Sequence, residues 1–186
     1  ATMLRQFVML DDPDITSRIE KIWPHVKSFG KDKLTKIQAL EQLVNESNLA
    51  PNLTDGRQLF RQHCSSCHKL FGEGGTTAPE LTGAQRSNLR YLSENIIDPS
   101  ASVADNYRVT LFLMNDGTLV SGVPLIEDAS TVIVQTTKDK VVLEKTEIES
   151  RKRSTQSLMP EGLLDSLDNQ AKIDLMAYLK STHQVP

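Results

Sequence analysis

The sequence predicts a mainly α protein that carries a small antiparallel β insertion and an N-terminal helical hairpin. Three observations predict this fold class. Apolar residues recur at the helical spacing of three and four residues in the first part of the chain and again close to its end. Between residues 106 and 150 the spacing changes to the alternation typical of strands. Capping residues, glycines and prolines separate these segments, as expected at helix ends and in turns.

Length and composition describe an ordinary globular chain. It has 186 residues, of which 38 % are hydrophobic and 24 % are charged, and its formal net charge is −3. This charge is too small to favour nucleic acid as a partner. No apolar run approaches the ~20 residues that a membrane span needs. No signal peptide is visible at Ala1, although a mature or excised chain would have lost one.

Two helices are expected in an N-terminal extension of residues 1–50. The first starts near Asp14, and Pro24 should kink or end it. Asp32 is the expected N-cap of the second helix. The two should form a hairpin with a scaffolding role, whereas residues 4–10 fit either a strand or an entry linker.

A third helix should begin at Thr54 or Asp55, which are both suitable caps. Gly56 and Phe60 share one face of this helix. A glycine at that position allows another helix to approach closely. Residues 69–85 are rich in glycine and should form an irregular loop.

The remaining chain contains two more expected helices with the β insertion between them. One helix should cover residues 86–97, and Asp168 or Asn169 should cap the last one. Within the insertion, Asp116-Gly117 is a strong hairpin signal. The insertion should form about four strands, at 107–113, 119–126, 131–136 and 141–145.

The segment with the clearest chemistry is Cys64-x-x-Cys67-His68. This spacing is the attachment signal of a c-type haem. Both thiols lie on one side of a helical turn, where they can form thioether bonds to the two vinyl groups of one porphyrin. His68 then points at the iron. A buried porphyrin would also add apolar mass to a chain with only 5 % aromatic residues.

Pro79 is the expected partner of this histidine. An iron-bound imidazole commonly donates its other ring N–H to a carbonyl, which fixes the tautomer and the ring plane. Pro79 lies eleven residues after His68, and its carbonyl is the candidate acceptor. The alternative is that Pro79 only shapes the loop.

Met159 is the favoured second axial ligand of the iron. It lies in an expected loop and is followed by Pro160, which would hold the thioether in place. Ligation by histidine and methionine raises the reduction potential. The other candidates are Met114, Met176, His63, His183, and Met3 or Met9. Met176 lies on the apolar side of the last helix, where a methionine usually fills the core.

Two other uses of the cysteine pair are less favoured. A structural zinc site usually needs two such pairs, and this chain has one. A thioredoxin-like dithiol would follow a strand, whereas Cys64 follows an expected helix.

The same residues resemble a class I cytochrome c. Gly56, Phe60 and Tyr178 are similar to the pair of helices that cross in that fold. Pro79 matches the family proline whose carbonyl meets the proximal histidine, and Met159 matches the methionine ligand. In ordinary members the methionine follows the histidine much sooner, because they lack the β insertion.

A closer resemblance covers about residues 15–182. This part of the chain resembles the haem-binding domain that is appended to large membrane-bound dehydrogenases of the planctomycete–verrucomicrobial group. The matching segments are Gly56-x-x-Leu59-Phe60, 70–75, 79–83, 95–100, Asp116-Gly117 and 157–163.

These resemblances imply a cytochrome c domain at 51–186, interrupted by the β insertion at 106–150. They imply one covalent haem c with iron, attached to Cys64 and Cys67. They also imply a non-enzymatic carrier. Because covalent haem c is normally attached outside the cytoplasm, the motif itself predicts a periplasmic location. The carrier would accept electrons from a fused or partner dehydrogenase of the sugar or alcohol type and pass them to a further carrier. The alternative function is a haem sensor or a small haem enzyme with a displaceable sixth ligand.

Overall fold

The computed structural model describes residues 13–22 and 31–186. The described residues form five α-helices and seven strands. The helices are α2 (Pro13–Ile22), α3 (Lys31–Glu46), α4 (Leu53–His63), α5 (Leu89–Ile97) and α6 (Asn169–Lys180). The expected segment at 4–10, the break at Pro24 and the turn of the N-terminal hairpin lie outside the described residues.

Helices α4 and α6 cross at very close range. A Cβ atom added to Gly56 would lie 2.1 Å from the carbonyl oxygen of Asp174 and 2.7 Å from Cβ of Tyr178. The rings of Phe60 and Tyr178 meet with their centroids 5.8 Å apart. This confirms that Gly56 allows another helix to approach. Phe60, Met176 and Tyr178 are fully buried in the core of the helical part.

The cap of α4 differs from the prediction, whereas the cap of α6 is one of the two residues predicted. The cap of α4 is Asn52, whose side-chain oxygen accepts hydrogen bonds from the backbone N–H groups of Thr54 and Asp55. The prediction of Thr54 or Asp55 was therefore wrong, because both residues already belong to the first turn. At α6, Asp168 is the cap, and its carboxylate accepts from Ala171 N–H at 2.8 Å.

The β region is larger than expected. Its strands are β3 (Arg108–Met114), β4 (Leu119–Glu127), β5 (Thr131–Gln135), β6 (Lys140–Glu144) and β7 (Ile148–Ser157). They form one antiparallel sheet in the order β6-β5-β4-β3-β7. A separate two-stranded hairpin, β1 (Lys69–Leu70) with β2 (Glu73–Gly74), lies inside the expected 69–85 loop.

The fifth strand of the sheet, β7, was not predicted. Its sequence is polar, and most of its side chains are exposed, so it lacks the apolar alternation that marks a strand. Its backbone nevertheless pairs with β3 over most of the strand's length. The prediction of a mainly α chain is therefore not confirmed, because the sheet is too large a part of the molecule.

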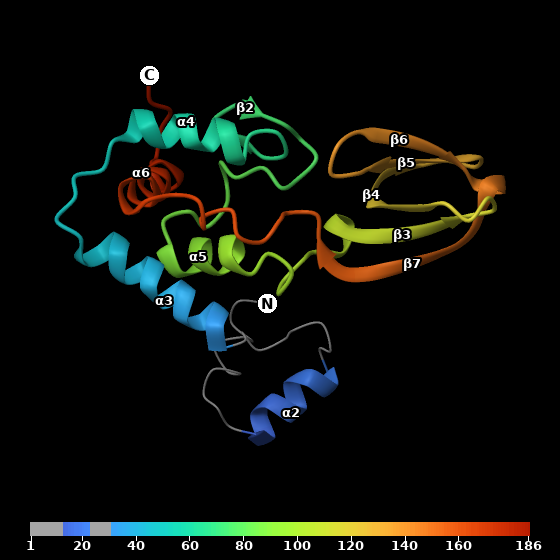
Figure 1. Ribbon diagram of the computed structural model, residues 1–186, viewed down its shortest axis with the longest axis horizontal. Helices are drawn as coiled ribbons and strands as arrows, with labels where there is room; N and C mark the ends of the chain where they lie inside the picture. The colour runs from blue at the N-terminus through green and yellow to red at the C-terminus, as the bar shows by residue number, and fades with distance from the viewer. Residues whose placement is uncertain (1–12, 23–30) are drawn as a thin grey trace.

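The sheet and the helical part have separate cores. The sheet core contains Phe112, Met114, Val132, Val134 and Leu143, and it shares no residue with the core around Phe60 and Tyr178. Figure 1 shows the two parts at opposite sides of the molecule, with the segment after β7 returning to the helices. The domain division at residues 50 and 51 stays a prediction.

Within residues 13–22 and 31–186, no helix is both long enough and apolar enough to cross a membrane.

Candidate haem site

The two cysteines lie on a tight turn at the end of α4. The backbone N–H of Cys67 donates to the carbonyl oxygen of Cys64 at 3.2 Å, and that of His68 donates to the same oxygen at 2.9 Å. Cys64, Cys67 and His68 are all partly exposed. The turn thus brings both thiols and the imidazole into one short segment of backbone, as attachment to a single porphyrin requires.

A glycine-rich loop wraps closely around this turn. Gly74 has a φ of 112°, and a Cβ atom there would lie 2.1 Å from the carbonyl oxygen of His68. A Cβ atom on Gly75 would lie 2.4 Å from the carbonyl oxygen of Ser66. Backbone N–H groups of Gly75 and Ala78 donate to carbonyl oxygens of the turn. Only glycine permits this contact, which fixes the position of the turn.

The His68 ring is oriented by Pro79. His68 Nδ1 lies 2.8 Å from the carbonyl oxygen of Pro79. Because a carbonyl can only accept, Nδ1 carries the hydrogen and Nε2 keeps its lone pair. Burial lowers the pKa of His68, although the hydrogen bond to Pro79 acts in the opposite direction. The imidazole is therefore a neutral ring with one nitrogen able to bind a metal.

Cys64 lacks the lowered pKa that is typical of a redox-active thiol. Burial, followed by the nearby Cys67, raises the pKa of Cys64 to about 12. Catalytic cysteines of oxidoreductases have lowered pKa values, because the thiolate is the reactive form. No group of three or more histidine, cysteine or acidic residues within the described part of the chain could hold a metal ion. The raised pKa of Cys64 thus disfavours the thioredoxin-like interpretation.

The other candidate axial ligands lie in varied surroundings. Met114 is 8 % exposed in the sheet core, and Met176 of α6 is fully buried in the core of the helical part. His63 is the last residue of α4, directly before the cysteine turn. The exposed His183 has a contact of 3.2 Å between its Nδ1 and Thr182 Oγ1. Met3 and Met9 lie outside the described residues.

Met159 lies in a bend directly after β7 and is partly exposed. Its backbone N–H donates to Ser157 Oγ at 3.1 Å. The bend belongs to the segment that leads from the sheet back to α6 (Figure 1). Met159 is thus free of both apolar cores, unlike Met114 and Met176.

Arg86 is a buried residue whose role the sequence does not reveal. By residue type it is a candidate partner of the haem propionates, together with Arg90, Tyr91 and Tyr107. The structure instead places its guanidinium against four carbonyl oxygens, those of Leu81, Thr82, Leu179 and Ser181. It also lies over the Phe71 ring, 4.8 Å from the centroid.

The Arg86 contacts join the loop after Pro79 to the last turn of α6. Carbonyl groups at a helix C-terminus carry partial negative charge, which favours a cation there. Burial lowers the pKa of Arg86, yet a guanidinium remains charged at any physiological pH. A single sequence carries no signal that distinguishes such a buried arginine from an exposed one.

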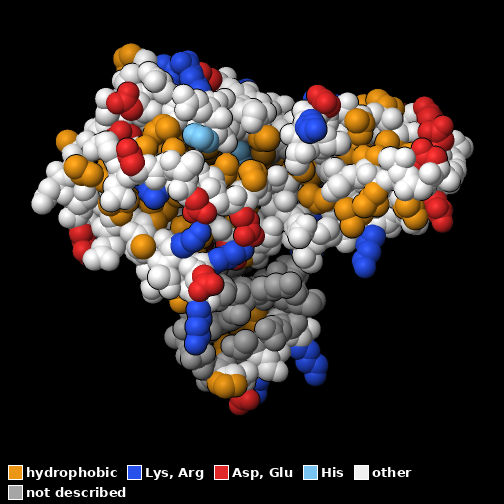
Figure 2. All heavy atoms as spheres, in the orientation of Figure 1, with side chains coloured by type: hydrophobic (Ala, Val, Ile, Leu, Met, Phe, Trp, Pro, Cys, Tyr) orange, Lys and Arg blue, Asp and Glu red, His pale blue; other side chains and the backbone are white. Residues whose placement is uncertain are grey.

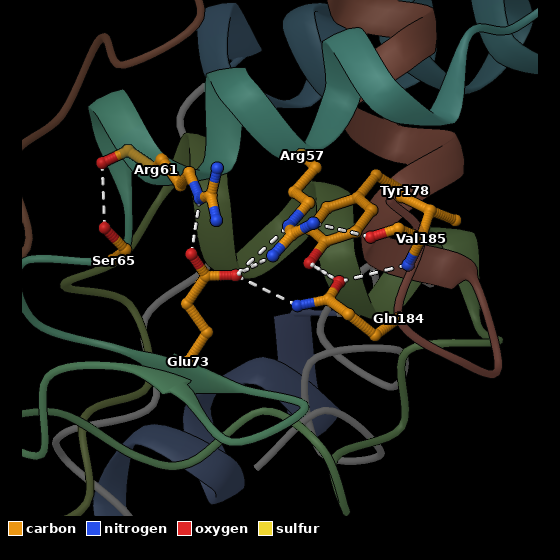
Figure 3. A network of polar contacts seen from close by, with 7 residues as sticks. All are labelled: Arg57, Arg61, Ser65, Glu73, Tyr178, Gln184 and Val185. Carbon is orange, nitrogen blue, oxygen red and sulfur yellow. Dashed lines mark hydrogen bonds and ion pairs between the residues drawn. The ribbon is translucent and has the colours of Figure 1, made fainter.

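A second polar network joins α4 to the hairpin of β1 and β2. Glu73 forms ion pairs with Arg57, at 3.0 Å, and with Arg61. Gln184 donates to the same carboxylate and accepts from the Tyr178 hydroxyl at 2.6 Å. Figure 3 shows these side chains converging on Glu73 from α4 and from the C-terminal segment. The network holds the loop that surrounds the cysteine turn.

Together these features fit the requirements of a c-type haem site. Two thiols and a neutral imidazole lie on one turn at the end of α4, with a helix crossing behind them. Residues 53–110 match the model of the cytochrome c family. This match covers less than half of the chain, and it implies that the cofactor is covalently bound haem c with iron. Cys64 and Cys67 fit the attachment motif.

One curated relative matches a short part of this chain. A stretch of 46 residues is 44 % identical to a nitric oxide reductase subunit from Paracoccus denitrificans. The match covers 24 % of this chain and 31 % of the relative, so the chain spans about a third of that protein's length.

Proposed function

We propose that this chain is a monohaem electron carrier in which His68 and Met159 are the two axial ligands of the iron. Cys64 and Cys67 attach the haem, and Pro79 orients His68. The observation that carries this proposal is the 2.8 Å contact between His68 Nδ1 and the Pro79 carbonyl oxygen, which leaves Nε2 for the iron. When bound, haem c supplies an iron that alternates between the ferrous and ferric states.

The chain's own residues hold the site rigid. The turn and its glycine-rich loop fix the imidazole, and the Arg57, Arg61 and Glu73 network holds that loop to α4. A thioether from Met159 would leave the iron with no open position. A closed iron suits electron transfer and not substrate chemistry, so the chain is not an enzyme by itself.

The donor we propose is a dehydrogenase of the sugar or alcohol type, either fused to this domain or a separate partner. A further carrier would accept the electrons. This part of the proposal rests on the resemblance of residues 15–182 to dehydrogenase-appended domains. Covalent haem c is normally attached outside the cytoplasm, which supports a periplasmic location.

A second candidate comes from the curated relative. That protein is named as a subunit of nitric oxide reductase. By analogy, this chain would be the haem-bearing subunit of a larger redox enzyme rather than the partner of a dehydrogenase. Both candidates use the same haem site and differ only in the protein that exchanges electrons with it.

Replacement of the proposed sixth ligand tests the shared claim. We expect Met159→Ala to lower the reduction potential by on the order of 0.1 V, because loss of the thioether removes its stabilisation of ferrous iron. The control is Met176→Leu, a core methionine whose replacement should leave the potential unchanged. Potentiometry followed by absorption measures both variants. Equal potentials in wild type and Met159→Ala would refute the ligand assignment.

A further inference from the structure

The bend that carries Met159 is attached to a turn at the end of α5. This turn, Asp98-Pro99-Ser100, directly follows α5, and both Asp98 and Pro99 are buried. On one side of the bend, the backbone N–H of Ser157 donates to Ser100 Oγ at 3.1 Å. Met159 follows two residues after Ser157. The chain just before the methionine is therefore joined to the turn by a hydrogen bond.

The chain just after Met159 is connected to the same turn by Lys33 of α3. Lys33 Nζ lies 2.7 Å from Asp98 Oδ1 and 2.6 Å from Glu161 Oε1. Glu161 is two residues after Met159. One ammonium group thus bridges the buried carboxylate of the turn and the carboxylate that follows the methionine. These contacts join segments 65 and 128 residues apart in the sequence.

The segment after Met159 faces α3 with both apolar and charged side chains. A cavity of about 380 Å³ lies between them, lined by Lys33, Lys36, Ile97, Leu163 and Leu164 among others. Figure 2 shows acidic and basic side chains gathered over this region of α3 and α5. Lys33 and Glu161, which form one of the two ion pairs, both line this cavity.

We propose that Lys33 is a positioning residue for the sixth iron ligand, acting through Asp98 and Glu161. The N-terminal extension would then have a function, namely to keep the Met159 thioether in place. This inference rests on the proposed assignment of Met159 as a ligand. Lys33 differs from its neighbour Lys36, which pairs with Asp165 at 3.2 Å with both side chains more than half exposed.

Burial of one partner makes the Lys33 bridge the stronger of the two. The Asp98 side chain is only 9 % exposed, and that of Lys33 is 31 % exposed. A buried carboxylate that loses its cation is costly, whereas exposed ion pairs contribute little. Lys36→Gln is therefore a matched control on the same helix for Lys33→Gln.

The test measures imidazole binding to the ferric holoprotein, followed by absorption. Imidazole must displace the thioether, so its apparent affinity reports how firmly Met159 is held. We expect Lys33→Gln to raise this affinity about tenfold, which is the size expected for one charged hydrogen bond. Lys36→Gln should change it by less than about threefold. Lys33→Arg, which keeps both ion pairs, should restore the wild-type affinity.

Met159→Ala separates the two proposals. If this variant binds imidazole no better than wild type, Met159 is not the ligand and the proposed function fails. If Met159→Ala binds more tightly but Lys33→Gln matches Lys36→Gln, the ligand assignment stands and the Lys33 proposal is refuted. Should Lys33→Gln fail to fold, Asp98→Asn weakens the buried arm of the bridge, and an unchanged affinity there refutes the Lys33 proposal equally.

Discussion

At the scale of single residues, the haem site depends on hydrogen bonds that leave little freedom to the cysteine turn. Pro79 accepts from His68, and the loop that continues from Pro79 is held in turn by Arg86. The proposed haem residues Cys64, Cys67 and His68 could be predicted from the sequence, because their spacing is a chemical requirement of haem attachment. Arg86 could not, because its partners are backbone carbonyls far away along the chain.

We expect Arg86→Lys to destabilise the protein by about 2–4 kcal/mol, because lysine cannot reach four carbonyl oxygens at once and some would remain buried without a donor. Denaturant unfolding of the holoprotein measures this difference. Arg151→Lys is the control, since the Arg151 side chain is 52 % exposed and its ion pair with Glu127 contributes little. Equal losses in both variants would contradict the role given to Arg86.

Glu73 should make the free energy of unfolding depend on pH in the acidic range. Hydrogen bonds from Arg61, followed by those from Arg57, hold the pKa of Glu73 below its ordinary value of 4.5. A carboxyl with a lowered folded-state pKa stabilises the fold above pH 4.5, and this contribution is lost as the pH falls through the folded-state pKa.

Glu73→Gln should therefore cost about 1 kcal/mol at neutral pH, and the difference from wild type should shrink in acid. Urea unfolding at neutral pH and at a pH well below 4.5 measures both differences. A difference that stays constant across this range would show that the charge of Glu73 is not what stabilises the network.

At the scale of elements, the crossing of α4 and α6 positions the cysteine turn. Helices α4 and α6 could be predicted from the helical spacing of their apolar residues. The close approach at Gly56 could also be predicted, because a glycine on a helix face is visible in the local sequence. The strand β7 could not be predicted, because a strand at the edge of a sheet needs few apolar side chains. Its pairing with β3 is a long-range backbone interaction that its polar sequence does not reveal.

We expect Gly56→Ala to destabilise the protein by more than about 3 kcal/mol, because the new methyl group would overlap the backbone of Asp174. Gly83→Ala is the control, since a Cβ atom there would meet nothing within 4 Å. Thermal unfolding of the two holoproteins compares them. A Gly56→Ala variant as stable as Gly83→Ala would mean that the helices can separate without cost.

At the scale of the whole molecule, the helical part and the sheet have separate cores that share no residue. The contacts around Met159 that involve Ser100 and Asp98 belong to the turn after α5, not to the sheet core. The sequence indicated an insertion between the two proposed ligands, but it carried no sign that α3 contacts the segment after β7. That contact depends on tertiary placement of charged residues.

Phe112→Ala should therefore weaken the sheet and leave the haem site intact. Phe112 is fully buried, and its removal should cost about 3–5 kcal/mol. In urea, far-ultraviolet circular dichroism should show an earlier loss of sheet while the visible absorption keeps its wild-type midpoint. If both signals shift together, the two cores unfold as one unit.

The central claim is that protein side chains close both faces of the haem iron. The most direct measurement is the absorption spectrum of the reduced holoprotein at neutral pH, recorded with and without carbon monoxide. We predict an unchanged spectrum, because His68 and Met159 would occupy both axial positions. Ready binding of carbon monoxide would contradict this account and would favour a haem sensor or a small haem enzyme with a displaceable ligand.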